Sequence, residues 1–170
     1  MNSTKQNEIQ ILKLPYQSDA RGNFIKLYQK TSLALKDFNV RQVNYVENPE
    51  KNVFRGLHYQ LGVHSESKLF RVLDGFLILY AFCYNRDDKN YLKLFSFELS
   101  SKSSVLVPEG YATGYLVKKQ NTKMHYMSNK DFCPESENGI CYNDPVLNLS
   151  LPKSIIVSEK DTKWALFKDD

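Results

Sequence analysis

Cysteine and histidine are scarce in this chain of 170 residues, which has three of each. The cysteines, Cys83, Cys133 and Cys141, are odd in number and form no CxxC pair. This excludes the usual patterns of a disulfide framework and of a zinc cage, so we expect reduced thiols.

Long apolar runs are also missing. No stretch of about 18 apolar residues exists, and the beginning, MNSTKQNEIQILKLPYQ, has no apolar core of a secretory signal. The sequence therefore predicts a cytoplasmic protein with no membrane partner. Apolar and aromatic fractions of 42% and 13% argue against a disordered chain, and the length fits a single domain over residues 1–170.

The chain has no dense cluster of one charge. Its net charge of +4 comes from 23 basic and 19 acidic residues that are dispersed along the sequence. Without a basic helix, nucleic acid is not an expected partner. Scattered arginines suit a phosphorylated small molecule better.

Short apolar runs recur throughout the sequence, and turn signals such as NPEKN, NRDDKN and SSKSS separate them. The runs are residues 23–29, 40–46, 68–84, 91–100, 104–117 and 123–128. Only residues 30–39, KTSLALKDFN, read as a helix. Evenly spaced short strands that do not alternate with helices predict an all-β sandwich or barrel of jelly-roll type, with short peripheral helices.

The segment FRGLHYQ, residues 54–60, concentrates chemically active side chains. On a regular strand Arg55 and His58 would face opposite sides, but a bulge near Gly56 would bring them into one cleft. His58 is a candidate base because histidine titrates near neutrality. The alternative is a core histidine with a satisfied hydrogen bond.

Three further segments have a chemical and a structural interpretation. Lys68 begins a strongly apolar strand, so its ammonium should point into a cleft or reach solvent along its stem. The segment VPEGYATGYL, residues 107–116, is a turn that re-enters a strand, or simply a barrel corner. In SEKD, residues 158–161, Asp161 offers a carboxylate on what is otherwise a solvated turn.

A transition-metal site is not predicted. Metal-binding jelly-roll enzymes use two histidines one residue apart, whereas this chain has only His58, His64 and His125. We expect neither a metal nor an organic cofactor.

An ordered series of motifs resembles the dTDP-4-dehydrorhamnose 3,5-epimerases, a family of metal-free cupins that act on nucleotide-linked 4-keto sugars. DARGNF is similar to the family's D-x-RG-x-F, RQVN to its Q-x-N, and FRGLHYQ with SKLFRVLDG to its RGLHYQ and KL-x-RV-x-x-G. VPEGYATGYLV, PESENGICYNDP and VSEKD resemble its PEGFAHGF, PE-x-E-x-GI-x-W-x-DP and S-x-KD. The resemblance extends from about residue 18 to about residue 164 and implies a cupin-type jelly roll, or double-stranded β-helix.

The resemblance also implies roles for individual residues. His58 would be the general base and Asp161 the carboxylate that orients it. Tyr126 would be the acid on the opposite face of the sugar, and Lys68 would neutralise charge on the C4 oxygen. The residues implied in substrate binding are Arg21, Phe24, Gln42, Asn44, Arg55, Gln60, Thr113, Phe132, Glu137 and Lys160.

The implied reaction is epimerisation at C3, C5 or both of a nucleotide-diphosphate-linked 4-keto-6-deoxy sugar, in deoxysugar biosynthesis for surface polysaccharide such as lipopolysaccharide or capsule. A carbon beside a ketone forms an enolate, so a base, an acid and a cation suffice. Two alternatives remain open: a 3,4-ketoisomerase that uses the same enolate, and a sugar-nucleotide binding cupin without turnover.

The chain departs from the family pattern at several positions. Thr113 replaces the histidine of AHG, Leu79 an aspartate, and Phe132 the second aromatic of a YY pair. Lys26 and Tyr142 replace a glutamate and a tryptophan. Loss of polar groups around the sugar predicts faster exchange at C3 than at C5. We also expect a homodimer, because the alternating apolar residues of NEIQILKLPYQ could join a partner's sheet.

Overall fold

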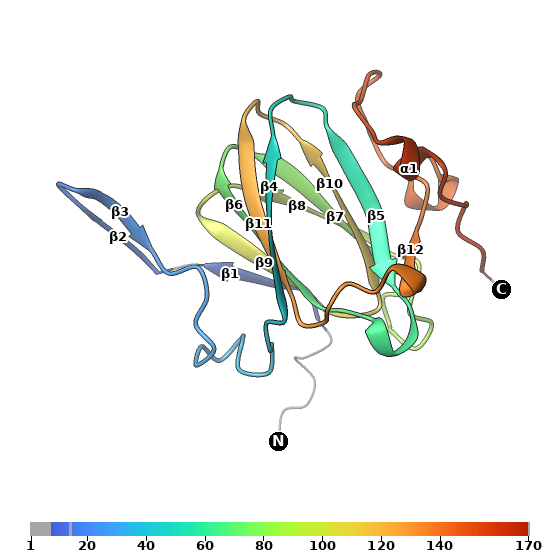
Figure 1. Cartoon of the computed structure of the whole chain (residues 1–170). Coiled ribbons are helices and arrows are strands. Elements are labelled where there is room, and N and C mark those ends of the chain that lie inside the picture. Colours follow the sequence, from blue (N-terminus) through green and yellow to red (C-terminus); the bar gives the residue numbers. More distant parts are fainter. Residues whose placement is uncertain (1–7, 14, 170) are drawn as a thin grey trace.

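The computed structural model describes residues 8–13 and 15–169, and it consists mainly of two antiparallel five-stranded sheets that face each other (Figure 1). The first sheet has the order β1-β9-β6-β11-β4 and the second the order β12-β5-β10-β7-β8. This arrangement confirms the predicted all-β jelly roll.

The strand bounds agree with most of the predicted apolar runs. The first sheet contains β1 (Gln10–Lys13), β9 (Ser103–Val107), β6 (Lys68–Asp74), β11 (Thr122–Ser128) and β4 (Gln42–Asn48). The second contains β12 (Glu137–Gly139), β5 (Phe54–Gln60), β10 (Tyr111–Val117), β7 (Leu77–Cys83) and β8 (Leu94–Leu99). A separate hairpin joins β2 (Tyr16–Asp19) to β3 (Gly22–Ile25).

Helices are short and peripheral, as the sequence predicts, but none of those in the described residues lies at residues 30–39. They are the 3₁₀ turns η1 (Gly62–His64), η2 (Pro134–Ser136) and η3 (Pro145–Leu147), and the single-turn helix α1 (Glu159–Thr162). None of the helices in the described residues is long and apolar enough to cross a membrane.

The predicted helix over residues 30–39 is wrong. These residues form successive turns, in which the amides of Ser32, Leu35 and Phe38 each bond the carbonyl three residues earlier. Isolated helices of this length are marginal in water, so packing decides the local structure. Here the turns direct the side chains of Leu35 and Phe38 onto the outer side of the first sheet, where both are buried.

Three apolar clusters hold the sheets in place. The largest lies between the sheets and includes Val72, Leu79, Val105 and Met124. A second cluster covers the outer side of the second sheet and draws on the C-terminal segment up to Phe167. The third is the one beneath residues 28–40. Burial on both sides of each sheet fixes the register of the central strands and hence the positions of the inward side chains.

Strand β5 contains the predicted bulge. Its register against β10 pairs His58 with Thr113 but Arg55 with Tyr115, so Gly56 and Leu57 together oppose a single residue. Gly56 has a φ of +114°, and a Cβ there would lie 2.6 Å from the Cα of Gly114. Because of the extra residue, Arg55 and His58 face the same side of the sheet, as the sequence predicts.

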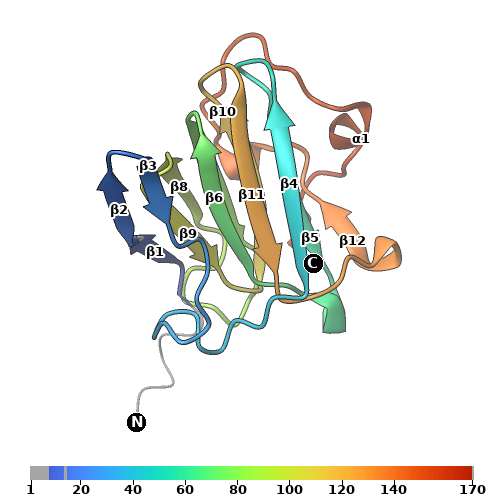
Figure 2. The ribbon, with the colours of Figure 1, turned by 60° about the vertical axis from the view of Figure 1, so that its left-hand side comes forward.

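The N-terminal part of the chain forms an edge strand and an arm. Strand β1 pairs with β9 of its own chain and forms the edge of the first sheet, and its joining a partner's sheet stays a prediction. The β2–β3 hairpin then projects from that edge of the molecule, away from β5 and α1 (Figures 1 and 2). Almost all of its residues are exposed.

Candidate active site

Polar side chains of both sheets face the space between them, at the side where β4 forms the edge of the first sheet and β12 and β5 form the end of the second. Residues paired across antiparallel strands share a face, so the register identifies those that point inward. We call this group the interior site. From the first sheet it contains Gln42, Asn44, Asn48, Lys68, Tyr126 and Ser128, and from the second Arg55, His58, Gln60, Thr113, Tyr115 and Glu137.

His58 and Asp161 form a pair at the second sheet, in which Asp161 is buried and His58 is partly exposed. The Nε2 atom of His58 lies 2.6 Å from Oδ1 of Asp161, whose side chain is only 4% exposed. The same oxygen accepts a bond from Nε1 of Trp164 at 3.3 Å, and Oδ2 accepts the Gly56 amide at 3.2 Å. An ionised carboxylate that accepts from Nε2–H leaves Nδ1 of His58 as the nitrogen that can take a proton.

The environment of Asp161 keeps its carboxylate ionised. Burial acts to raise the pKa of Asp161, but the hydrogen bond and charge of His58, with the bonds from Gly56 and Trp164, outweigh it and lower the pKa. Asp161 lies on α1, whose cap residue Ser158 accepts the Asp161 amide at 3.1 Å. The cap fixes the turn that carries the carboxylate under β5.

Lys68 at the first sheet also has a carboxylate partner, which sequence reasoning missed. Its Nζ lies 2.9 Å from Oε1 of Glu66, and both side chains are largely buried, at 12% and 11% exposure. Ser128 donates its hydroxyl to the other oxygen of Glu66 at 2.5 Å. Two partners therefore hold the Glu66 carboxylate in place beside the ammonium group.

Tyr126 lies on β11 of the same sheet as Lys68, opposite the sheet of His58. Its ring packs against Phe70, with centroids 5.6 Å apart. Burial is the main cause that raises the pKa of Tyr126, followed by the negative charge of Glu66, while Arg55 acts to lower it. The phenol is therefore protonated at neutral pH and can serve as an acid.

Two buried polar atoms of the interior site have no hydrogen-bond partner among the described residues. They are Nδ2 of Asn44 and the hydroxyl of Tyr115. Oδ1 of Asn44 accepts a bond from Nε2 of Gln42 at 2.9 Å. Most buried polar groups in proteins are satisfied, so unpaired groups in a candidate site indicate a place for a ligand.

The predicted binding residues Gln60 and Phe132 meet at one end of the interior site. The amide of Gln60 bonds the carbonyls of His64 and Asp131 and accepts the Cys133 amide at 2.6 Å, so it holds the loop that follows β11. The Phe132 amide donates to Oε1 of Gln42 at 2.9 Å.

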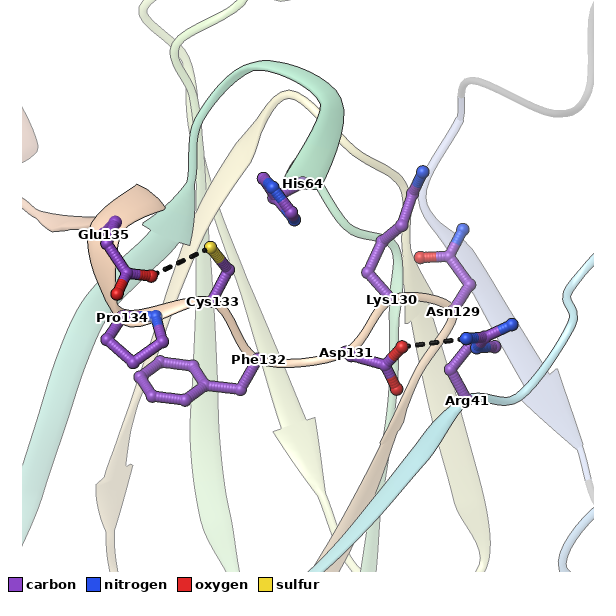
Figure 3. Close-up of a pocket in the computed structure, with 9 residues that line it drawn as sticks. All are labelled: Arg41, His64, Asn129, Lys130, Asp131, Phe132, Cys133, Pro134 and Glu135. Atoms are coloured by element: carbon purple, nitrogen blue, oxygen red, sulfur yellow. Dashed lines mark hydrogen bonds and ion pairs between the residues drawn. The ribbon is translucent and has the colours of Figure 1, made fainter.

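This loop forms one wall of a surface pocket of about 550 Å³ (Figure 3). Its lining combines an exposed aromatic ring with groups of both charges, and Arg41 pairs with Asp131 at 2.9 Å across one end. The lining residues are Arg41, His64, Asn129, Lys130, Asp131, Phe132, Cys133, Pro134 and Glu135.

Glu137 and Lys160, both predicted from the resemblance, contact each other. Nζ of Lys160 lies 2.6 Å from the Glu137 carboxylate and 5.5 Å from the centroid of the Trp164 ring. Glu137 pairs with Gln60 in the register and also acts on the pKa of Tyr126, so it lies on the interior side. The pair therefore closes the edge of the site next to α1.

The structure does not bring Arg21 and Phe24 to the rest of the site. Both lie on the β2–β3 arm, where Arg21 pairs with Asp19 at 2.6 Å and Phe24 is 64% exposed. Within one chain, the arm and β5, the strand of His58, lie on different sides of the molecule (Figure 1).

The two positions at which the chain departs most from the family motif are neighbours. Leu79 stands opposite Tyr115 and Thr113 opposite Ala81, so the side chains of Leu79 and Thr113 share the inner face of adjacent strands. Leu79 is fully buried in the apolar cluster, and Thr113 donates weakly to the His58 carbonyl at 3.5 Å. This wall of the site is thus less polar than the motif implies.

Sequence reasoning missed several residues of the site. Glu66 carried a local signal, because it precedes Lys68 by two positions and a strand places such residues on one face. Asn48, Tyr115, Ser128 and Trp164 gave no comparable signal, since their positions depend on pairing between distant strands. Across the described residues no group of three or more histidine, cysteine, aspartate or glutamate side chains could hold a metal ion.

Comparison with known proteins gives a consistent result. The family model described as dTDP-4-dehydrorhamnose 3,5-epimerase matches residues 3–169. The chain is 29% identical to the dTDP-4-dehydrorhamnose 3,5-epimerase of Escherichia coli K12, over 94% of this chain and 90% of that protein. Both findings confirm the resemblance read from the motifs.

Solved structures agree with this assignment. The dTDP-4-dehydrorhamnose 3,5-epimerase of Elizabethkingia anophelis is similar with a TM-score of 0.86 and 28% identity, over 99% of this chain and 96% of that one. A dTDP-6-deoxy-D-glucose-3,5-epimerase from Legionella pneumophila, solved with dTDP-4-keto-L-rhamnose, has a TM-score of 0.85 and 28% identity, over 93% and 87%. The chain belongs to the dTDP-4-dehydrorhamnose 3,5-epimerase family.

Proposed function

We propose that this protein epimerises C3, C5 or both of a nucleotide-diphosphate-linked 4-keto-6-deoxy sugar through an enolate, in deoxysugar biosynthesis for surface polysaccharide. Family membership supports this activity and its isomerase class. The relative from Legionella pneumophila, with dTDP-4-keto-L-rhamnose bound, supports a thymidine nucleotide as the first substrate to test.

One observation supports the proposal: the imidazole of His58 and the phenol of Tyr126 stand on opposite sheets across the interior site. The base is His58, oriented by Asp161 at 2.6 Å, and the acid is Tyr126 on the facing sheet. Inversion of a carbon requires the proton to leave from one face and return to the other. Two sheets that hold the sugar between them meet this requirement.

The proposed mechanism has two proton transfers and one charged intermediate. Nδ1 of His58 removes the proton from the carbon beside the ketone, and the Asp161 carboxylate stabilises the imidazolium that forms. The electron pair moves to the C4 oxygen, where Lys68 neutralises the enolate charge. Tyr126 then delivers a proton to the other face, and exchange with solvent restores both groups.

The test follows solvent protons. The chain is incubated in heavy water with dTDP-4-keto-6-deoxyglucose and other nucleotide 4-keto sugars, and deuterium at C3 and C5 is measured by NMR. Deuterium incorporation with inverted configuration supports the epimerase. A product in which the carbonyl has moved to C3 indicates a ketoisomerase, and binding without any exchange indicates a cupin that has lost turnover.

We further propose that exchange at C3 is faster than at C5. A second epimerisation needs a second orientation of the sugar, and Leu79 and Thr113 offer this wall few hydrogen bonds to hold one. Equal rates of deuterium incorporation at the two carbons would contradict this preference.

We propose that the nucleotide end of the substrate reaches the pocket beside Phe132, whose ring is 52% exposed and free to stack on a base (Figure 3). Phe132→Ala should weaken binding of dTDP and dTDP-sugar by the same factor. Loss confined to the sugar ligand would place the base elsewhere.

A homodimer is also part of the proposal. The outer side of β4 exposes Val43 and Tyr45, and the arm exposes Tyr16 and Phe24, so a large apolar surface is left uncovered in one chain. A partner's arm could supply Arg21 and Phe24, which cannot reach the site of their own chain. Co-refolding His58→Asn with Arg21→Ala chains should then restore part of the activity, whereas a monomer by light scattering would contradict the proposal.

We propose a cytoplasmic location and a single functional domain over the whole chain. All three cysteines are free, which suits a reducing compartment. Both sheets contribute to the interior site, so neither sheet would carry the activity alone. Fractionation of the native host with a specific antibody tests the location.

A further inference from the structure

Two tyrosines on β10 share the inner face of the second sheet but differ in their hydrogen bonds. Tyr111 and Tyr115 are 4% and 5% exposed. The Tyr111 hydroxyl accepts a bond from Nδ2 of Asn90 at 3.2 Å and donates to Asp88 at 3.4 Å. The Tyr115 hydroxyl is buried and has no partner within the part of the chain that the structure describes. A buried unpaired hydroxyl reduces stability, so its presence requires a reason.

Polar groups surround Tyr115, but none completes its hydrogen bonding. Arg55 stands opposite it in the register, and the Asn48 side chain acts as a weak donor toward the Tyr115 oxygen without reaching full hydrogen-bond geometry, so the hydroxyl hydrogen has no acceptor among the described residues. Oδ1 of Asn48 already accepts from Nε of Arg55 at 3.2 Å, and its Nδ2 donates to the Thr122 carbonyl at 3.3 Å. Burial raises the pKa of Tyr115 to about 12, so the phenol keeps its proton at neutral pH.

The position of Tyr115 relates it to the reacting sugar. Tyr115 follows Thr113 by two residues on one face, and Thr113 stands opposite His58, so Tyr115 lies on the base's side of the interior site. Leu79, directly opposite on β7, is apolar, and the Thr113 hydroxyl is directed to the His58 carbonyl. Among these three neighbours, Tyr115 alone has a polar hydrogen that no described residue accepts.

We propose that the Tyr115 hydroxyl donates a hydrogen bond to an oxygen substituent of the bound sugar ring and thereby helps to select the sugar. The inference rests on the proposed function, because it assumes that a sugar lies between His58 and Tyr126. Since the hydroxyl is closed off from solvent, the sugar must displace a side chain to reach it. Arg55 is exposed and stands opposite Tyr115, so it is the neighbour that can move once its bond from Nε to Oδ1 of Asn48 opens.

The test compares Tyr115→Phe with Tyr111→Phe as the matched control on the same strand. Affinities for dTDP and for dTDP-glucose are measured by calorimetry, and their ratio isolates the contribution of the sugar. We expect Tyr115→Phe to reduce this ratio and kcat/KM about tenfold, while Tm stays unchanged or rises by about 2 °C. Tyr111→Phe should lower Tm by about 3 °C and leave the ratio and turnover unchanged.

The opposite pattern overturns the proposal. If Tyr115→Phe keeps the ratio, or lowers Tm while turnover is retained, the hydroxyl is structural and a buried water satisfies it. A wild type that binds dTDP and dTDP-glucose equally also contradicts a sugar contact. The proposed function has its own test and fails if the wild type incorporates no deuterium from heavy water. The affinity ratio does not depend on turnover, so the two failures can be distinguished.

Discussion

The interior site contains two pairs of a nitrogen group and a buried carboxylate, one on each sheet, and they differ in how they are built. His58 bonds Asp161 across 103 residues of sequence, and the carboxylate sits on a capped turn beneath β5. Lys68 bonds Glu66, two positions earlier in the same segment, and Ser128 steadies the carboxylate from the next strand. The two pairs face each other across the space in which the sugar would lie.

The difference in construction matches a difference in chemistry. A base must gain and lose a proton in each cycle, so the carboxylate beside His58 must be ionised and must fix which ring nitrogen is free. In the proposed mechanism Lys68 only has to present a positive charge, and Glu66 holds the ammonium group in position. We therefore expect substitutions in the His58–Asp161 pair to reduce turnover more than substitutions in the Lys68–Glu66 pair.

The largest loss should come from the base itself. His58→Asn removes the proposed base, so deuterium incorporation at both carbons should fall about 10⁴-fold. Binding of dTDP should stay within several fold, because the nucleotide contacts other residues. Calorimetry with dTDP is the control. Retained deuterium exchange with an inverted product would show that His58 is not the base.

The orienting carboxylate should rank second. In Asp161→Asn the amide oxygen is best placed at the position of Oδ1, because Oδ1 accepts from both His58 and Trp164. The new NH2 group then takes the position of Oδ2 and faces the Gly56 amide, so two hydrogen-bond donors meet. We expect turnover to fall about 10³-fold with little change in dTDP binding. A loss below about tenfold would mean that packing against Trp164 orients the imidazole without the carboxylate.

The same variant has a signature in the pH dependence of stability. The pKa of Asp161 is lowered in the folded chain, so its ionised form stabilises the fold above its unfolded pKa of about 4. That contribution disappears as pH falls through the lower folded value. The difference in Tm between wild type and Asp161→Asn should therefore narrow below pH 4, as calorimetric melts at several pH values would show. A constant difference across this range would contradict the assigned pKa direction.

The two pairs also show what the sequence could predict. Periodicity and turn signals predicted the strands, and the glycine in FRGLHYQ predicted the bulge that aligns Arg55 with His58. The contact of His58 with Asp161 depends on chain closure over 103 residues, so no local pattern contains it and only the family resemblance suggested it. Glu66 had the better local signal, yet burial decides its importance, and spacing does not reveal burial.

The other features that the sequence did not predict also depend on contacts between distant residues. The ten residues from 30 to 39 have helical composition, but two side chains packed on the first sheet determine their turns. The unpaired hydroxyl of Tyr115 follows from the register of β10 against β5 and β7, which the sequence does not specify. Local propensity thus predicted elements and individual residues, and tertiary pairing determined partners.

The cation ranks third in expected effect. Lys68→Met removes the charge that stabilises the enolate, so kcat should fall about 10²-fold while the affinity for dTDP-glucose changes little. This variant leaves Glu66 buried without its partner, which should lower Tm. The double variant Lys68→Met with Glu66→Gln is the control, and it should recover Tm without recovering kcat. An effect confined to affinity would make Lys68 a binding residue.

The smallest effect should come from the partner of the cation. Glu66→Gln keeps one oxygen, which can accept from Lys68, and places an amide group that can donate to the Ser128 hydroxyl oxygen, but it removes a negative charge that helps to raise the pKa of Tyr126. At neutral pH we expect kcat to change by less than about fivefold, since both the position and the charge of Lys68 are preserved.

Above neutrality the activities of Glu66→Gln and of the wild type should differ. Tyr126 must be protonated to act as the acid, so activity is lost as pH rises through its pKa, and this loss should begin at lower pH in Glu66→Gln than in the wild type. Ser128→Ala removes a hydrogen bond to Glu66 without removing its charge, and should leave the alkaline limit in place. If the limit does not move in Glu66→Gln, Tyr126 is not the group that titrates there. If Glu66→Gln instead reduces kcat as much as Asp161→Asn does, the carboxylate on the first sheet takes part in proton transfer, and the two pairs do not differ in function.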